Sequence, residues 1–369
     1  MSTFHPLRVV AVDRLTDDAV ALTFDVPPDL RGLYGYAPGQ HIAVRRPRTQ
    51  GGASASTEVR RTYSLCAPAA EAPATLRVGI RGVEGGDFST YALKELAPGD
   101  SVDVLPPTGR FVLEPRHGHF AAVVGGSGIT PVLSIAATLL SREPGARFCL
   151  IRSDRSTAST MFLEEVADLK DRFPDRFQLV TALSREEQQS GLPTGRLDEE
   201  RLSMLLPSLL PVSDIDGWYL CGPLGLVEGA SRALRGLQVP RGRIHQEIFH
   251  VTEAPSGDAA TAVASAGRKA ASSGASARTA AVTATLDGRS GCWPMDDGES
   301  VLETVLRNRA DAPFACKGGV CGTCRVRLVS GEVRMERNYA LEPDELDAGY
   351  VLACQSHPVT DAVEVDFDG

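Results

Sequence analysis

Four cysteines in the last part of the chain have the types and spacing of metal or cluster ligands. The stretch CKGGVCGTC contains Cys316, Cys321 and Cys324, and Cys354 follows thirty residues after the third. This C-x4-C-x2-C…C pattern is the spacing of plant-type [2Fe–2S] proteins. The glycines of the stretch let the backbone wrap closely around an inorganic core and direct N–H groups to its sulfurs. The pattern therefore predicts a [2Fe–2S] cluster on these four cysteines.

Two other chemistries also use clustered cysteines. Zinc sites of four cysteines usually consist of two separate C-x2-C pairs, whereas here only Cys321 and Cys324 form such a pair. A redox-active dithiol is expected next to a βαβ pattern, and this pair does not follow one. Zinc therefore remains the main alternative to the cluster.

The glycine-rich stretch GGSGITP, residues 125–131, follows an apolar strand-like run and precedes a helix-like run. In that position a turn presents backbone N–H groups to a phosphate at the start of a helix. Its form is G-x-G-x-x-P rather than the full dinucleotide fingerprint, so a tight strand-to-helix turn explains it equally well when it is taken alone. With a redox cluster downstream, it favours a nicotinamide-nucleotide site.

Two stretches nearer the N-terminus match the needs of a flavin. A flavin requires a cation for its pyrophosphate, an aromatic face for its ring and a hydrogen-bond partner near N5. Within RRTYSL, Arg61, Tyr63 and Ser64 can supply these in turn. Within EGGDFSTY, backbone amides and a hydroxyl can meet the phosphates, from Gly85, Gly86 and Ser89. Each stretch by itself is also an ordinary strand or turn.

The segments that must position these residues differ in their sequence patterns. Short β-rich runs separated by turn signals fill residues 6–113 and predict an antiparallel β-barrel. Strands and helices alternate through residues 119–250, which predicts a parallel sheet with helices on both faces. A stretch rich in Ala, Ser, Gly and Thr follows and is expected to be a flexible linker. The predicted boundaries are 1–115 (flavin-binding β-barrel), 116–251 (nucleotide-binding α/β domain), 252–279 (linker) and 280–369 (α+β, β-grasp ferredoxin domain).

Composition and charge restrict the class of protein. The chain of 369 residues is 43% hydrophobic and 23% charged, with a net charge of −9. Residues 280–369 contain 8 Lys and Arg against 16 Asp and Glu, so most of the excess acid lies in the predicted ferredoxin domain. An acidic balance argues against a nucleic-acid partner. Without an apolar run of membrane length or a recognisable signal peptide, the chain is expected to be cytoplasmic and free of membranes.

The order of these motifs resembles the ferredoxin–NADP reductase superfamily, in the arrangement with a plant-type ferredoxin at the C-terminal end. The resemblance covers the whole chain except the linker. The stretches EGGDFSTYA, GSGITP, ACKGGVCGTC and NYALEPDELDAGYVLACQ are similar to those of the reductase subunits of phenylacetyl-CoA epoxidases. The resemblance implies electron transfer from NAD(P)H through FAD and a [2Fe–2S] cluster to an oxygenase component in phenylacetate degradation. FMN is the alternative flavin, because FMN-using relatives with a fused ferredoxin exist.

The resemblance also implies roles for individual residues. The flavin-binding residues are Arg61, Thr62, Tyr63, Ser64, Val78, Gly79, Gly85, Gly86, Phe88 and Ser89. The nicotinamide-nucleotide turn consists of Gly126, Gly128, Thr130 and Pro131. The residues expected near the reacting atoms are Ser64, Cys221, Glu247 and Phe249, and the last is an aromatic ring over the flavin that moves when nicotinamide stacks.

One departure from the family concerns the choice of nucleotide. Members commonly read GNRT after the second strand of the nucleotide domain, whereas this chain reads SDRS. Arg155 and Ser156 can bind a 2′-phosphate, which favours NADPH. Asp154 can instead accept from a ribose 2′-hydroxyl, which favours NADH. We expect NADPH.

Two alternative functions follow from the same residues. The first is the reductase of another multicomponent oxygenase, such as a ketosteroid or aromatic-ring hydroxylase. The second is a zinc-stabilised nucleotide-binding module without a redox role.

Overall fold

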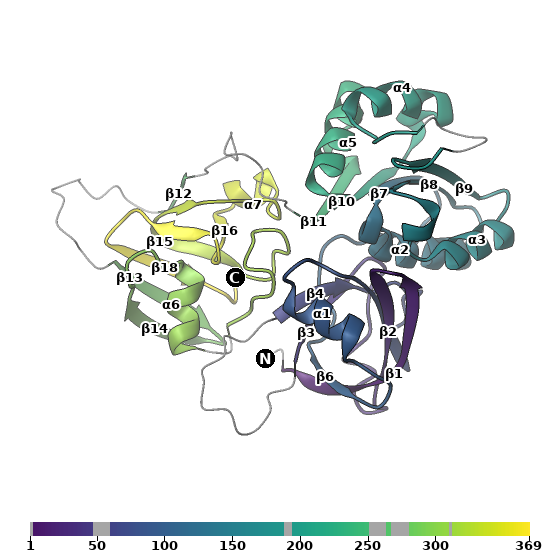
Figure 1. Ribbon diagram of the computed structural model, residues 1–369. Helices are drawn as coiled ribbons and strands as arrows, with labels where there is room; N and C mark the ends of the chain where they lie inside the picture. Colours follow the sequence, from purple (N-terminus) through teal and green to yellow (C-terminus); the bar gives the residue numbers. More distant parts are fainter. Residues whose placement is uncertain (1–2, 47–59, 188–193, 251–262, 267–279, 310–311) are drawn as a thin grey trace. The chain divides into compact units, whose positions relative to one another are not determined.

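The structure is a computed structural model that describes residues 3–46, 60–187, 194–250, 263–266, 280–309 and 312–369. The chain divides into two compact units, residues 2–252 and residues 253–369. The first unit contains the flavin-type barrel and the nucleotide-type sheet, and the second contains the four clustered cysteines (Figure 1).

The first half of the larger unit is an antiparallel sheet that closes on itself. Its six strands follow the order β4-β3-β6-β1-β2-β5, and a bridge between Leu65 and Val78 joins the two outer strands. Apolar residues alternate toward the interior, as in β6, where Val102 and Val104 are buried, because successive side chains of a strand point to opposite faces. The elements are β1 (His5–Thr16), β2 (Ala19–Asp25), β3 (His41–Arg45), β4 (Arg60–Ser64), β5 (Thr75–Arg81), α1 (Asp87–Lys94) and β6 (Ser101–Val104). The predicted barrel is confirmed.

The second half is a five-stranded parallel sheet in the order β11-β10-β7-β8-β9. Helices α2 and α3 cover one face, and α4 and α5 cover the other (Figure 1). The strands are β7 (His119–Gly125), β8 (Arg147–Asp154), β9 (Phe177–Leu183), β10 (Gly217–Pro223) and β11 (Ile244–His250). The helices are α2 (Ile129–Arg142), α3 (Leu163–Arg172), α4 (Glu199–Leu209) and α5 (Leu224–Gly236), with short 3-10 turns η1 (Gly126–Gly128), η2 (Thr157–Ser159), η3 (Val212–Asp214) and η4 (Arg241–Arg243).

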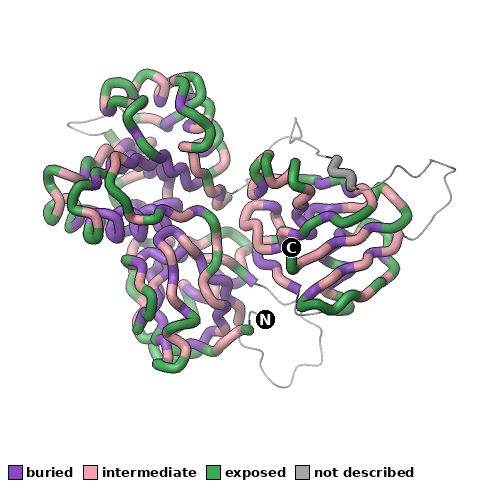
Figure 2. The backbone as a smooth tube through the Cα atoms, turned by 180° about the vertical axis from the view of Figure 1, so that it is seen from behind, coloured by how far each residue is buried: buried purple, intermediate pink, exposed green. Residues whose placement is uncertain are grey.

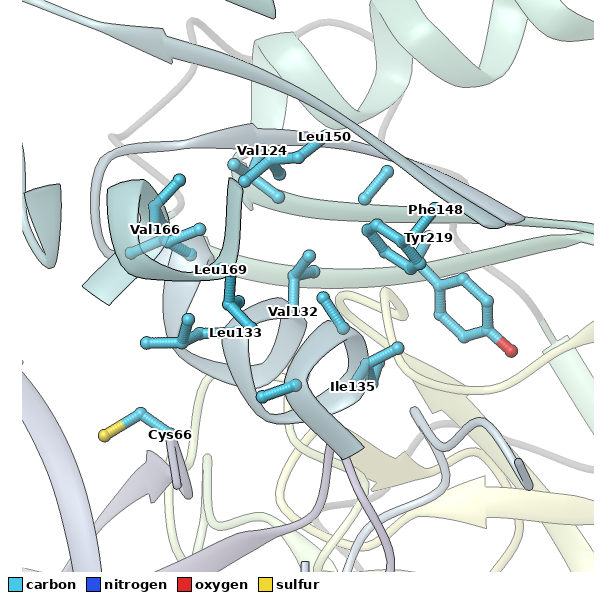
Figure 3. Close-up of a cluster of buried hydrophobic side chains, with 14 of the residues drawn as sticks. Cys66, Val124, Val132, Leu133, Ile135, Phe148, Leu150, Val166, Leu169 and Tyr219 are labelled. Atoms are coloured by element: carbon cyan, nitrogen blue, oxygen red, sulfur yellow. The ribbon is translucent and has the colours of Figure 1, made fainter. Parts of the chain in front are cut away.

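The core of this half explains why its strands read as continuous apolar runs. Burial on both faces requires such runs in a parallel sheet, and Figure 2 shows buried residues gathered along these strands. Val132 of α2 and Val166 of α3 pack toward Val124 and Leu150 of the sheet (Figure 3). The strand order reverses between β7 and β10, and ligands bind in parallel sheets at the carboxyl ends of strands beside such a reversal.

The smaller unit is a mixed sheet of seven strands packed on helix α6. Four strands follow one another in the order β15-β18-β13-β14, and β16 and β17 pair with β15. Ser300 and Glu303 form a capping box that begins α6, and its apolar face joins the core of the unit. The elements are β13 (Ala281–Leu286), β14 (Arg289–Pro294), α6 (Val301–Asn308), β15 (Arg325–Met335), α7 (Pro343–Asp347), β16 (Tyr350–Leu352), β17 (Ser356–Pro358) and β18 (Ala362–Asp366).

Part of the predicted linker differs from the expectation. Residues 263–266 form a strand, β12 (Val263–Ala266), that pairs antiparallel with Gly331–Arg334 of β15. The exposed edge of a sheet carries unpaired backbone groups that recruit another strand whatever its side chains, so composition alone did not reveal it. The rest of the predicted linker, 252–262 and 267–279, lies outside the described residues.

Candidate functional site

The stretch Arg61–Ser64 (the RxYS motif) lies on β4, and successive side chains of this strand face in opposite directions. Ser64 is buried, Tyr63 is half-buried and Arg61 is exposed, so the cation and the hydroxyl point to different surroundings. The rings of Tyr63 and Phe88 lie 5.6 Å apart, and burial raises the pKa of Tyr63, so its hydroxyl stays protonated. Thr62, which lies between Arg61 and Tyr63 on the strand, is half-buried.

The loop before α1 is shaped by Ser89. The Val83 N–H donates to Ser89 Oγ at 3.2 Å, and Ser89 Oγ donates to Gly86 O at 3.3 Å. Gly85 has φ +69°, and among the described residues no atom lies within 4 Å of the place that a Cβ would take there. The hydroxyl of Ser89 thus folds the loop, and the open backbone around Gly85 remains for a phosphate.

The glycine-rich turn lies directly against the end of β10. A Cβ on Gly128 would lie 2.2 Å from Cys221 O, and Gly126 adopts φ +54°. Thr130 Oγ1 donates to Ser127 O at 2.9 Å, and Pro131 lies in the first turn of α2. Gly128 offers no side chain to cap α2, and the positive end of the helix dipole at this start favours an anion.

Residues of the barrel also meet this turn. Val78 is buried in the barrel core, and a Cβ on Gly79 would lie 2.7 Å from both the Thr130 side chain and the Phe162 ring. Only glycine therefore permits this close packing of the barrel on the nucleotide domain. At this junction Gly79, one of the predicted flavin residues, meets Thr130 of the predicted nucleotide turn.

Three of the predicted reactive residues meet at that junction. Ser64 Oγ donates to Glu247 Oε2 at 3.5 Å, and Cys221 Sγ lies 4.0 Å from the same oxygen. Strand pairing explains the second contact, because Cys221 and Glu247 are paired across β10 and β11. Burial raises the pKa of Glu247 to about 8, so its carboxyl is protonated at neutral pH. Burial also raises the pKa of Cys221, so its thiol is neutral.

His41 joins this group, although the sequence patterns did not single it out. His41 Nδ1 lies 3.8 Å from Glu247 Oε1, and burial lowers the pKa of His41 to about 4. Among the residues that the structure describes, no hydrogen-bond partner faces His41 Nε2. A polar residue at an otherwise buried position of β3 was the available signal.

Phe249, the predicted aromatic cover of the flavin, lies near the end of β11. Its ring is partly buried and packs against the core of the nucleotide domain. It follows Glu247 by two residues, so both side chains lie on the same side of the strand.

The predicted 2′-phosphate residues lie after β8, where their contacts are internal to the unit. Arg155 Nη2 is 2.9 Å from Asp18 Oδ2, and both side chains are exposed. Ser156 forms a capping box with Ser159 at η2. Exposed ion pairs contribute little stability, so Arg155 can exchange Asp18 for a phosphate.

Arg81 is a further residue that the sequence patterns did not single out. Its guanidinium reaches from β5 to Ser159 O and to Asp18, and a Cβ on Gly126 would lie 2.8 Å from Arg81 Nη1. The signal was a basic residue at the end of an apolar strand. Its position adds a cation beside the glycine-rich turn.

In the smaller unit the four clustered cysteines influence one another. The pKa of Cys316 is lowered mainly by the Cys321 thiol and then by backbone amides, and the pKa of Cys354 is lowered mainly by the Cys324 thiol. Cys324 and Cys354 are buried. Cys354 also interacts with Cys316, and Cys324 with Cys321, so the four thiols form one group, as the ligands of a cluster or of a single metal ion must.

Two glycines of the cysteine loop adopt backbone conformations that other residue types disfavour. Gly319 and Gly322 have φ +78° and +67°, a conformation that side chains disfavour. The Gly318 N–H lies 3.3 Å from Cys316 Sγ, and Gln355 Nε2 donates to Lys317 O at 2.9 Å. Because an amide already points at a sulfur, the loop fits a sulfur-ligated cluster.

Comparisons with known proteins agree with this geometry. Residues 6–113 match the oxidoreductase FAD-binding domain, residues 123–232 the oxidoreductase NAD-binding domain and residues 284–359 the 2Fe-2S iron-sulfur cluster binding domain. The chain belongs to the ferredoxin–NADP reductase superfamily, in the group of oxygenase reductases that carry FAD-binding, NAD-binding and [2Fe–2S] domains. It is an oxidoreductase, and its cofactors are FAD, NAD(P)H and a [2Fe–2S] cluster.

Individual relatives span the full length of the chain. It is 41% identical to a subunit of the 1,2-phenylacetyl-CoA epoxidase of Escherichia coli (strain K12), over 100% of this chain and 99% of the relative. It is 31% identical to the ferredoxin reductase component of 3-ketosteroid-9-alpha-monooxygenase from Rhodococcus rhodochrous, over 98% and 96%. The structure of phthalate dioxygenase reductase shares the fold, with 22% identity and a TM-score of 0.60 over 99% and 98% of the two chains.

Hydropathy adds one observation. Within the described ranges, none of the helices combines the length and the apolar character needed to cross a membrane.

Proposed function

We propose that this chain is the reductase component of a phenylacetyl-CoA epoxidase and that its preferred electron donor is NADPH. The convergence of Ser64, Cys221 and Glu247 at the junction of barrel and nucleotide domain supports hydride transfer there. The identity of 41% over the full length of both chains supports the partner. The cytoplasmic location and the domain boundaries predicted from the sequence remain predictions.

The residues around the junction prepare a site for two stacked rings. Flavin accepts two electrons as a hydride and passes them on singly to an iron–sulfur centre. Ser64, held by Glu247, presents a hydroxyl from β4, and Cys221 places an uncharged thiol beside the same carboxyl group. Because the Glu247 carboxyl keeps its proton at neutral pH, no negative charge on this group opposes a hydride arriving beside it.

The outer residues hold the cofactors in place. Arg61 and the backbone of the loop at Gly85 and Gly86 would hold the flavin pyrophosphate. The start of α2 after Gly128 would hold the nucleotide pyrophosphate, and Phe249 would cover the flavin until nicotinamide replaces it.

In the smaller unit, Cys316, Cys321, Cys324 and Cys354 would hold the cluster. The amide of Gly318 near Cys316 Sγ would stabilise negative charge on the ligands and raise the reduction potential.

A spectrum and a partner assay test the proposal. The purified chain should show flavin and [2Fe–2S] absorption that NADPH bleaches. With purified oxygenase components, it should support epoxidation of phenylacetyl-CoA and little hydroxylation of a 3-ketosteroid. A colourless protein would contradict the redox function, and equal turnover with both oxygenases would contradict the partner. The ketosteroid alternative rests on the 31% identity to that reductase.

A further inference from the structure

The departure from the family pattern after β8 has a structural explanation in a buried ion pair. Arg152 and Asp154 are two residues apart on β8, so their side chains lie on the same face. Arg152 Nε donates to Asp154 Oδ2 at 2.8 Å, and the two side chains are only 2% and 1% exposed. The acid that the sequence offered as a ribose ligand is therefore turned into the protein.

The Arg152 guanidinium also ties the following loop to the strand. Arg152 Nη2 donates to Met161 O at 3.0 Å. The Ser184 N–H donates to Asp154 O at 2.9 Å, which fixes the backbone of Asp154 from the residue that follows β9. In the part of the chain that the structure covers, Arg152 Nη1 and Asp154 Oδ1 have no hydrogen-bond partner. The Asp154 carboxylate therefore depends on Arg152 for its place in the interior.

The residues that remain at the loop surface are those suited to a phosphate. Arg155 is half-exposed and paired with the exposed Asp18. A second carboxylate, Glu186, reaches the loop, but both of its oxygens accept from Thr157, at 2.8 and 2.9 Å. With Asp154 withdrawn, a free carboxylate that would repel a 2′-phosphate is removed from this edge.

We propose that Arg152 determines nucleotide specificity by holding the Asp154 carboxylate inside the protein, away from the adenosine ribose. The proposal deepens the proposed function, on which it rests. Arg152 touches no nucleotide in this role. It is a positioning residue that acts through Asp154. Without it, the unpaired carboxylate turns outward, because a buried charge without a partner is strongly unfavourable. There it repels a 2′-phosphate and accepts from a 2′-hydroxyl.

The test compares Arg152→Met, Asp154→Asn and the double variant in the complete holoprotein. Flavin reduction by NADPH and by NADH gives kcat/KM for each nucleotide. Titration calorimetry with 2′,5′-ADP and with 5′-AMP measures binding of the adenosine end independently of turnover. In Arg152→Met the NADPH to NADH ratio of kcat/KM should fall at least tenfold. The affinity for 2′,5′-ADP should fall similarly, with that for 5′-AMP unchanged or improved.

The other variants separate the mechanism from a general loss of structure. The double variant has no carboxylate to release, so its ratio should return to within about threefold of the unmodified chain. Asp154→Asn alone should leave NADH use unchanged. Weaker NADH use in Asp154→Asn with NADPH use unchanged would show that the acid already touches the ribose and would overturn the proposal, even if Arg152→Met failed to fold. An equal loss in Arg152→Met and in the double variant would also overturn it. If neither nucleotide reduces the flavin of the unmodified chain, the proposed function itself fails.

Discussion

Replacing Gly128 with alanine tests whether the glycine-rich turn is positioned by direct contact with the end of β10. A Cβ at this position would lie 2.2 Å from Cys221 O, 2.5 Å from Cys221 C and 2.7 Å from Gly222 N. Close carbon–oxygen contacts in proteins lie near 3.3 Å, so the turn and the strand must separate by about 1 Å. All three contacting atoms belong to the backbone, so no side-chain rotation can relieve the contact.

The expected cost follows from that displacement. Inserting a methyl group into a well-packed region costs about 1–3 kcal/mol, which lowers the melting temperature of a unit of this size by about 2–12 °C. A misplacement of about 1 Å near reacting groups can reduce the rate about 100-fold. Because the proposed function puts the nicotinamide beside the turn and Cys221, kcat/KM for NADPH should fall by about that factor.

Calorimetric unfolding and flavin reduction by NADPH measure the two effects. Gly225→Ala is the matched control, since a Cβ there meets no described atom within 4 Å and α5 gains up to about 1 kcal/mol from the better helix former. If Gly128→Ala kept both the melting temperature and kcat/KM of the unmodified chain, the contact would not position the turn and the reasoning would be wrong.

Two further predictions concern the buried carboxyl and the cluster ligands. Because the folded protein keeps the proton of Glu247 up to a pKa of about 8, against an ordinary 4.5, unfolding releases a proton between these values. The contribution of the protonated Glu247 carboxyl to the free energy of unfolding is complete below pH 4.5. It is lost as the pH rises to 8, by at most about 1.4 kcal/mol per pH unit. Glu247→Gln should lack this loss in thermal unfolding from pH 5 to 8.5, and parallel curves for both proteins would refute the assignment. Cys316→Ser should abolish the [2Fe–2S] signal in electron paramagnetic resonance and the transfer to the oxygenase, while NADPH still reduces ferricyanide through the flavin. Cys292→Ser, at an exposed cysteine outside the loop, is its control and should retain both activities, and a cluster that survived Cys316→Ser would contradict the ligand set.

The boundaries of regular elements show where sequence patterns stop being informative. The stretch after β8 predicts a helix over MFLEEVADLK, yet α3 begins at Leu163 and Phe162 takes a left-handed conformation, φ 56°. The Phe162 ring is buried against Gly79 of the barrel, so packing between domains decides where the helix begins. Strand β12 was hidden for a different reason, because it forms by pairing with an edge strand about 70 residues away within the smaller unit.

Local spacing in the sequence determined the cluster cysteines, the glycine-rich turn and the RxYS strand. Each of these depends on residues within one short segment, and their backbone conformations are set by glycine and by alternation. Only the tertiary structure decided which distant residues meet. His41, Ser64, Cys221 and Glu247 come from four different strands, and their contacts arise where the barrel packs on the parallel sheet. The sequence placed Arg152 and Asp154 on one face of β8, but the burial of that face, which pairs the two charges and withdraws the acid from the nucleotide, follows from packing alone.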